Sequence, residues 1–238
     1  MTARRATAGG GAATVGPAPA VAVMAKVPGL VPVKSRLHRA LSPERATALY
    51  RCFLLDRLEA LARVPGIAPV VAFTPPEGEA SIAALAPAVF ASVAQRGADL
   101  GERLSTLLAG LLGRGHRGAM AIDSDSPTLP MAHVVEAAAV LESGSADVVL
   151  GPTDDGGYYL IGLRAPEPRL FEDMPWSTPH VTPVTLERAR RLGLRVHLLP
   201  AWFDVDTEAD LRRLHGEIAR AGGGPPRTRQ FLRELYGQ

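Results

Sequence analysis

The sequence predicts an α/β domain in which helices cover both faces of a mostly parallel, mixed sheet. The first observation is a set of short, continuously apolar runs, such as residues 20–25 and 119–122, which are typical of strands buried on both faces. The second is the longer segments between them, such as residues 99–112, whose leucines recur at helical spacing. Repeated strand–helix units of this size favour parallel strands joined by crossover helices.

The elements are placed by their start and stop signals. The first helix begins at the N-cap residue Ser42, followed by Pro43, and stops at Pro65-Gly66. The spacer 154–157 is too short for a crossover helix, so the strand after it is expected to be antiparallel or reached by a wide loop. In chain order, strands are expected at 20–25, 69–73, 89–93, 119–122, 147–151, 158–163 and 195–199, and helices at 42–64, 79–85, 99–112, 131–141, 181–192 and 207–221.

One domain is expected, at residues 20–221. Residues 1–19 contain Arg4-Arg5 and then mostly small residues, Gly and Pro, without the apolar core of a signal peptide, so they are predicted to be a disordered tail. Residues 222–238 begin with three glycines and two prolines, which predicts a linker followed by a short helix.

Composition narrows the class of protein. The net charge is only +2 and aromatic residues make up 5% of the 238 residues, so the chain has no expected nucleic-acid partner. No apolar run approaches the ~18 residues of a membrane span. The single cysteine, Cys52, excludes an internal disulfide and suits a reducing compartment, so a cytoplasmic protein is expected.

A basic loop follows the first predicted strand and contains Lys26, Lys34 and Arg36. In open α/β sheets, ligands collect beyond the carboxyl ends of the strands. Cations and backbone N–H groups at that edge would suit a diphosphate or a triphosphate. The alternative is a solvated surface loop, and for three cations in one such loop we favour phosphate binding.

Acidic residues follow two later strands. Asp123 and Asp125 end the strand at 119–122, and hard carboxylate oxygens there are the ligands that Mg²⁺ or Mn²⁺ prefers. The alternative is a helix N-cap. Asp204 and Asp206 lie two residues apart on an extended segment, so one of them could supply a second carboxylate to the metal. For Asp206 a helix-capping role is the competing interpretation.

A fourth candidate is the segment 154–159. Gly156 and Gly157 would let the backbone approach a ligand closely, and an acid such as Asp155 could orient an acceptor hydroxyl. The alternative is only a tight turn, since Asp and Gly pairs favour turns.

In this order, the clusters resemble the bacterial rSAM/selenodomain-associated transferases of the GT-A superfamily. More distantly, the chain is similar to 2-phospho-L-lactate guanylyltransferase and the molybdenum cofactor nucleotidyltransferases. The chain departs from the family at Leu30-Val31-Pro32, where Pro-Gly-Arg is usual, and at Asp123, where Gly is usual. The matching stretches are 25–26 with 34–37, 95–103, 124–127, 150–152 with 155–163, 175–179 and 204–207.

The resemblance implies a GT-A-like (Rossmann-like) domain and roles for particular residues. Asp125 matches the superfamily's metal aspartate, and Asp206 or Asp204 matches its second acidic site, whereas Asp123 ranks below them. The remaining roles expected from the matching stretches are nucleotide binding for Gln95 and Asp99 beside Lys26, Lys34 and Arg36, and contact with the acceptor for Asp155, Gly156, Gly157, Tyr158, Trp176 and Ser177.

The function expected first is a nucleotidyltransferase that uses Mg²⁺ or Mn²⁺. It would transfer a nucleoside monophosphate from a nucleoside triphosphate to a phosphorylated small acceptor and release pyrophosphate. Lys26, Asp125 and Asp155 would be its catalytic residues. The alternatives are a GT-A glycosyltransferase with a nucleotide-sugar donor and a non-catalytic nucleotide-binding module.

Overall fold

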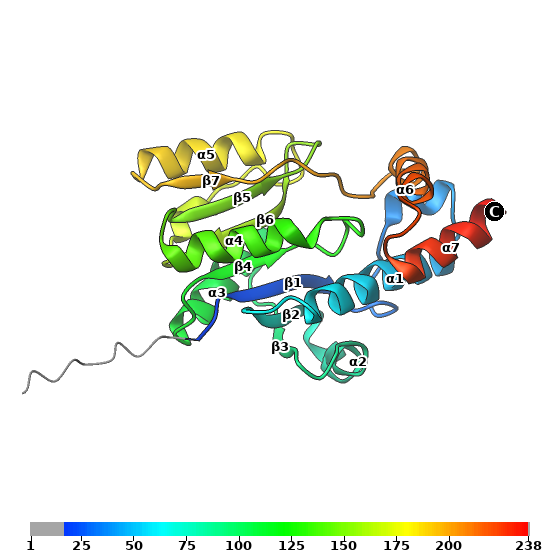
Figure 1. Ribbon diagram of the computed structural model, residues 1–238, viewed down its shortest axis with the longest axis horizontal. Coiled ribbons are helices and arrows are strands. Elements are labelled where there is room, and N and C mark those ends of the chain that lie inside the picture. The colour runs from blue at the N-terminus through cyan, green and yellow to red at the C-terminus, as the bar shows by residue number, and fades with distance from the viewer. Residues whose placement is uncertain (1–16, 238) are drawn as a thin grey trace, which may run out of the picture.

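One sheet organises the chain. The computed structural model describes residues 17–237, and in this part seven strands pair in the order β3-β2-β1-β4-β6-β5-β7 (Figure 1). The seven predicted strands are confirmed, although β3 lies slightly later than expected. The strands are β1 (Ala20–Lys26), β2 (Ala68–Thr74), β3 (Ala91–Ala94), β4 (Ala119–Ile122), β5 (Val148–Pro152), β6 (Tyr158–Leu163) and β7 (Val196–Leu198).

The sheet is mixed because one strand runs against the others. β6 pairs antiparallel with both β4 and β5, whereas all other neighbouring pairs are parallel. Of the two alternatives predicted for 158–163, an antiparallel strand or a strand reached by a wide loop, the antiparallel strand is the one observed. The chain leaves β1 towards β2 on one side, and β4 pairs with β1 on the other side. This reversal of strand order opens a crevice beyond the carboxyl ends of β1 and β4, where open α/β sheets bind ligands.

Helices cover both faces of the sheet, as predicted. α1 and α4 contribute to the apolar core on one face, and α3 and α5 to the core on the other. The predicted helices are all present, with ends that differ from the predicted ones by at most two residues. They are α1 (Pro43–Ala62), α2 (Glu79–Leu85), α3 (Leu100–Gly113), α4 (Met131–Ser143), α5 (Val181–Arg191), α6 (Glu208–Ala221) and α7 (Pro226–Tyr236).

Within residues 17–237, three short 3-10 helices were not predicted. They are η1 (Ser35–Arg39), η2 (Pro76–Gly78) and η3 (Pro168–Leu170). Such helices are too short to show an apolar periodicity in the sequence. η1 matters for function, because the segment expected to be a basic loop turns here and buries Leu37 fully.

The C-terminal helix packs onto the main body of the protein. α6 and α7 lie beside α1, at the end of the sheet to which the β1 arrow points (Figure 1), and share a third apolar cluster with it. The buried carboxylate of Asp56 on α1 accepts hydrogen bonds from the backbone N–H and the hydroxyl of Thr228, each at 2.8 Å. The predicted linker therefore leads into a helix that is fastened to α1.

The start of the chain falls partly outside the described residues. This applies to residues 1–16 of the predicted disordered tail. From Pro17 onwards the chain is hydrogen-bonded, since the Pro17 carbonyl accepts from the Arg117 N–H at 3.2 Å and the Pro19 carbonyl accepts from the Ala68 N–H at 2.9 Å. Within residues 17–237, no helix is both long enough and apolar enough to cross a membrane.

Candidate active site

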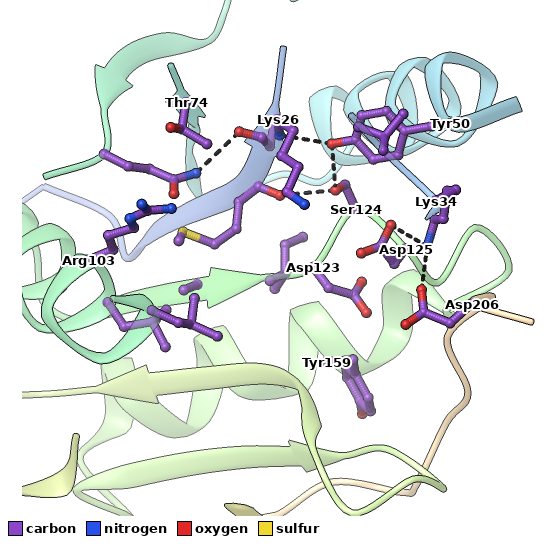
Figure 2. Close-up of a pocket in the computed structure, with 18 of the residues that line it drawn as sticks. Lys26, Lys34, Tyr50, Thr74, Arg103, Asp123, Ser124, Asp125, Tyr159 and Asp206 are labelled. Atoms are coloured by element: carbon purple, nitrogen blue, oxygen red, sulfur yellow. Dashed lines mark hydrogen bonds and ion pairs between the residues drawn. The ribbon is translucent and has the colours of Figure 1, made fainter. Parts of the chain in front are cut away.

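A cleft of about 430 Å³ lies at the switch point between β1 and β4 (Figure 2). Its wall is formed by the ends of both strands, the segment 33–36, the start of α3, the start of β6 and Asp206. The candidate residues from the sequence that line it are Lys26, Lys34, Arg36, Gln95, Asp123, Asp125, Tyr158 and Asp206.

Lys34 bridges two carboxylates that are far apart in the sequence. Its Nζ lies 2.6 Å from Asp125 Oδ1 and 3.0 Å from Asp206 Oδ1 (Figure 2). The Lys34 side chain is only 3% exposed, whereas those of Asp125 and Asp206 are 39% and 37% exposed. The structure thus brings Asp125 together with Asp206, one of the two alternatives for the second metal carboxylate, and places a buried ammonium group between them.

The electrostatics of this cluster follow from burial and charge. Burial by itself would lower the pKa of Lys34, but the charges of Asp125 and Asp206 outweigh it and raise that pKa above its usual value. Arg36 adds a second cation, with NH1 3.3 Å from Asp206 Oδ2, although its side chain is 65% exposed. Lys34 is therefore a permanent positive charge in the site, and Arg36 remains free to reorient.

The turn after β4 positions Asp125. The hydroxyl of Ser126 donates to Asp123 Oδ2 at 2.6 Å, and the fully buried guanidinium of Arg57 donates to the Ser126 carbonyl. The Val205 N–H donates to the Asp125 carbonyl at 3.0 Å, which ties this turn to the segment that contains Asp206. Local hydrogen bonds therefore fix the distance between the two acidic segments.

Tyr50 on α1 connects this turn to β1 and was missed by the sequence analysis. Its hydroxyl accepts from the Lys26 N–H at 2.9 Å and lies 3.0 Å from Ser124 Oγ. Ser124 Oγ in turn donates to the Met24 carbonyl at 3.0 Å. A tyrosine inside an apolar helical face gives no sequence signal of this role, because the same pattern is typical of an ordinary core residue.

Two further aspartates, Asp123 and Asp204, lie half-buried beside the paired acids. Burial, with a smaller contribution from Asp125 opposed by Arg57, raises the pKa of Asp123 to about 6. Burial followed by the charges of Asp206, Asp155 and Asp123 raises the pKa of Asp204 to about 7. Oδ1 of Asp123 is buried and has no hydrogen-bond partner in the described part of the chain. Such crowding of acids is unfavourable unless cations are added.

The donor set fits a divalent cation that is shared with phosphates. Among the described residues, no group of three or more His, Cys, Asp or Glu side chains is arranged to hold a metal by itself. Asp125 and Asp206, however, present oxygens within 3.0 Å of one point, the Lys34 nitrogen. Mg²⁺ is commonly held by one or two carboxylates plus substrate phosphates and water, and this pair would provide the protein's share.

Two more cations line the cleft. Lys26 ends β1, and within residues 17–237 its ammonium forms no ion pair. Arg103 on α3 donates from Nε to the Gly97 carbonyl at 3.1 Å and was missed by the sequence analysis. Arg103 lies inside a stretch that resembles the family, so the match itself was the signal that could have found it.

The two remaining nucleotide-side candidates differ in position. Nε2 of Gln95 donates to the carbonyls of Ala25 at 3.2 Å and Ala72 at 2.8 Å, so this residue closes the end of the sheet and lines the cleft. Asp99 instead lies at the N-cap of α3, where its carboxylate accepts from the Glu102 N–H at 2.8 Å. The geometry thus gives Asp99 a structural role.

The segment 154–157 forms a tight turn. Asp155 Oδ1 accepts from Thr153 Oγ1 at 2.5 Å and from the Gly157 N–H at 3.0 Å. Gly156 has φ +92°, and a Cβ there would meet the backbone of Pro179. The glycine is required by this close approach of two chain segments. The carboxylate of Asp155 is used within its own turn, and contact with an acceptor stays a prediction.

Tyr158 and Trp176 form an edge-to-face pair, with ring centroids 6.2 Å apart. Tyr158 lines the cleft, and burial raises the pKa of its hydroxyl. Within the part of the chain that the structure describes, neither the Tyr158 hydroxyl nor the Trp176 indole N–H has a hydrogen-bond partner, although both are buried. Ser177, the next residue, has the left-handed φ of 61°. Buried polar groups without a partner are rare in folded proteins, so these two call for an explanation such as a bound water or ligand.

Together, the α/β fold, the acid pair and the basic rim define a transferase of the nucleotidyl- and nucleotide-sugar-transferase class. The chain belongs to the family described as uncharacterized proteins conserved in bacteria (DUF2064), whose model matches residues 57–178. It is 32% identical to the phosphoenolpyruvate guanylyltransferase of Nocardia farcinica (strain IFM 10152) over 224 residues, which cover 91% of this chain and 92% of that protein.

Solved structures of similar proteins support the fold. A protein from Desulfovibrio desulfuricans G20, assigned as a nucleotide-diphospho-sugar transferase, superposes with a TM-score of 0.82 at 33% identity, covering 91% of this chain and 94% of that one. The CMP:2-keto-3-deoxy-manno-octonic acid synthetase, complexed with CTP, gives a TM-score of 0.56 at 14% identity, with 86% and 99% covered. The GT-A-like fold predicted from the resemblance is therefore confirmed.

Proposed function

We propose that this protein is a metal-dependent nucleotidyltransferase that transfers a nucleoside monophosphate from a nucleoside triphosphate to a phosphorylated small acceptor. The observation that carries the proposal is the pair Asp125 and Asp206 at the switch-point cleft. Their carboxylates converge on one cation, the ammonium of Lys34. A relative that is 32% identical over nearly the whole chain is named phosphoenolpyruvate guanylyltransferase. GTP is therefore the first donor, and phosphoenolpyruvate the first acceptor, to test.

The reaction forms one bond and breaks one bond at the α-phosphorus. An oxygen of the acceptor's phosphate attacks it, the bond to the bridging oxygen of the β-phosphate breaks, and pyrophosphate leaves with that electron pair. Catalysis of such a transfer consists of positioning and charge stabilisation. A bound Mg²⁺ or Mn²⁺ would neutralise charge on the phosphates, with Asp125 and Asp206 as the protein ligands that this proposal assigns.

The protein's own cations would receive the triphosphate. Lys26 and Arg103 line the cleft, and Arg36 is exposed at its rim. Three positive charges suit a triphosphate better than a diphosphate, because each phosphate group then has a charged partner. Gln95 is proposed on the nucleotide side of the cleft, and Tyr158 with Trp176 on the acceptor side, where their unpaired polar groups would meet acceptor oxygens.

The alternative is a glycosyltransferase with a nucleotide-sugar donor. The specific observation in its favour is the Desulfovibrio desulfuricans structure, which is 33% identical and assigned as a nucleotide-diphospho-sugar transferase. Such an enzyme neutralises only two phosphates and releases a nucleoside diphosphate. A non-catalytic nucleotide-binding module is a third alternative, against which the intact acid pair argues.

The product released separates these functions. The purified protein is incubated with Mg²⁺, phosphoenolpyruvate and each of the four nucleoside triphosphates, and pyrophosphate is measured. We expect pyrophosphate with one donor, and none from an Asp125→Ala variant whose melting temperature is normal. Nucleoside diphosphate released from a nucleotide sugar, with no pyrophosphate from any triphosphate and acceptor, would contradict the proposal and support the glycosyltransferase. Binding of nucleotide without either product would support the module.

A further inference from the structure

The acid pair is already neutralised by the protein itself. Lys34 and Arg36 together place two positive charges against the two negative charges of Asp125 and Asp206. The Lys34 ammonium lies where a cation shared by both carboxylates would lie, because its nitrogen is within 3.0 Å of an oxygen of each. A divalent cation that enters alone must therefore displace a buried ammonium or share the carboxylates with it.

Residue type supports a special role for Lys34. The chain has 26 basic residues other than His, and only Lys26 and Lys34 are lysines; all the others are arginines. Both lysines line the same cleft. An ammonium is a compact point charge on a flexible stem, whereas a guanidinium is a planar fork. A compact ammonium on a flexible stem can lie between two carboxylates and later move away. The larger, planar guanidinium of an arginine is less suited to this.

The backbone conformation at Lys34 is a further unusual feature of this position. Lys34 has φ 50° and ψ 38°, in the left-handed region, and it is the residue immediately before η1. A non-glycine residue in this conformation costs energy unless its surroundings stabilise it. The two ion pairs of the side chain, together with the Phe53 ring 5.9 Å from Nζ, are the contacts that hold it there.

We propose that Lys34 prevents the acid pair from binding a divalent cation alone, so that the metal enters as its complex with the nucleotide. This inference rests on the proposed function, because it assigns the nucleotide's phosphates as the partner that Lys34 takes when it leaves the carboxylates. Without phosphates, displacement of Lys34 leaves an unpaired ammonium in a buried place, which is strongly unfavourable. With phosphates, the ammonium exchanges one anionic partner for another.

The consequence is a reciprocal coupling between metal and nucleotide. If the nucleotide makes room for the metal by drawing Lys34 away, the metal must strengthen nucleotide binding by the same factor. Metal affinity then depends on the charge at residue 34 in the nucleotide-free protein, and much less so when nucleotide is present. If Lys34 only contacted phosphates, the metal affinity of the nucleotide-free protein would not depend on the charge at residue 34.

Mn²⁺ binding to the nucleotide-free protein tests the proposal, with free Mn²⁺ measured by electron paramagnetic resonance. The variants are Lys34→Met, Lys34→Arg and Lys26→Met, the last a matched lysine of the same cleft that contacts neither carboxylate. We expect Lys34→Met to bind Mn²⁺ at least about tenfold more tightly than the wild type, since it loses a charge-assisted contact on each carboxylate. Lys34→Arg keeps the charge and should stay weak, and Lys26→Met should match the wild type.

The same titration with a non-hydrolysable GTP analogue gives the coupling. In the wild type the analogue should tighten Mn²⁺ binding strongly, beyond the contribution measured for Mn²⁺ and the analogue without protein, and in Lys34→Met this gain should shrink. Equal Mn²⁺ affinities of the nucleotide-free wild type and Lys34→Met would overturn the inference. If Lys34→Met does not fold, the wild type alone decides, because equal Mn²⁺ affinity of the protein with and without the analogue also overturns it.

Failure of the inference and failure of the proposed function give different results. A protein that releases pyrophosphate but whose metal affinity ignores residue 34 keeps the function and loses the inference. The Lys34→Met variant could instead bind free Mn²⁺ more tightly while the protein releases no pyrophosphate from any triphosphate. That result would support the exclusion of free metal by Lys34 and contradict the assignment of a nucleoside triphosphate as the partner.

Discussion

The hydroxyl of Tyr50 lies 3.0 Å from Oγ of Ser124, and this contact joins α1 to the turn that contains Asp125. The same hydroxyl accepts from the N–H of Lys26, so one side chain connects the carboxyl ends of β1 and β4. Burial, followed by the charge of Asp125, raises the pKa of Tyr50, which keeps it neutral and able to donate at physiological pH. The two strands that frame the cleft are thus tied together by a neutral hydrogen-bonding hub.

Tyr50→Phe should therefore lower both stability and turnover. Removal of the hydroxyl leaves the Lys26 N–H without its partner, and a buried group left unpaired in this way costs about 1–3 kcal/mol. The free energy of unfolding, measured by urea titration, should fall by that amount. Tyr236→Phe is the control, because Tyr236 lies at the C-terminal end of α7 and stacks on His215, away from the cleft. An unchanged unfolding midpoint in Tyr50→Phe would mean that the hub is not rigid in solution.

Asp125→Asn should remove turnover while the fold stays intact. The substitution keeps the size of the side chain but leaves only Asp206 as a charged partner for the proposed metal and for Lys34. Loss of a ligand to a catalytic metal should lower kcat on the order of 10²-fold or more. The measurement is pyrophosphate release at saturating Mg²⁺, together with the melting temperature. Asp154→Asn, on an exposed pair with Arg213, is the matched control and should retain activity.

The sequence was sufficient for the fold because each element has a local signal. Buried strands such as 119–122 are continuously apolar, and α3 has both an N-cap acid and a leucine face. The short spacer before β6 excluded a crossover helix and left an antiparallel strand as one of two alternatives. The exceptions were the 3-10 helices, including η1, which contain too few residues for a periodic pattern.

The site was predicted less completely, because it depends on contacts between distant segments. Asp125 was expected from its position after a strand, and Asp206 was one of two alternatives with Asp204. The structure brings Asp125 and Asp206 within reach of one ammonium. The position of Lys34 between them is a tertiary property of a loop, and the sequence indicated only that the loop is basic. Tyr50 and Arg57 lie on apolar faces of α1, so nothing local distinguishes them from core residues that happen to be polar.

Acid should weaken the pairing of the edge strand β7 through Asp147. Hydrogen bonds from the Arg195 side chain and backbone lower the pKa of Asp147 to about 2 from its ordinary value of 3.8. A lowered folded-state pKa contributes stability above the unfolded pKa, and this contribution is lost as the pH falls from about 4 to about 2. Because the pair is exposed, its contribution at neutral pH is small, about 0–1 kcal/mol. Asp147→Asn should thus lower the melting temperature slightly at pH 7, and the difference from the wild type should vanish towards pH 2.

Tyr158→Phe should have opposite effects on the free protein and on the reaction. The Tyr158 hydroxyl is buried without a hydrogen-bond partner among residues 17–237, so its removal takes away an unsatisfied polar group and should leave the melting temperature unchanged or raise it. If the hydroxyl donates to the acceptor, the variant loses one hydrogen bond in the complex, and the KM for the acceptor should rise by up to about tenfold. The KM for the nucleotide should stay close to the wild-type value. A rise in the nucleotide KM with an unchanged acceptor KM would move Tyr158 to the donor side of the cleft, and a lower melting temperature would show that the hydroxyl is hydrogen-bonded within the protein after all.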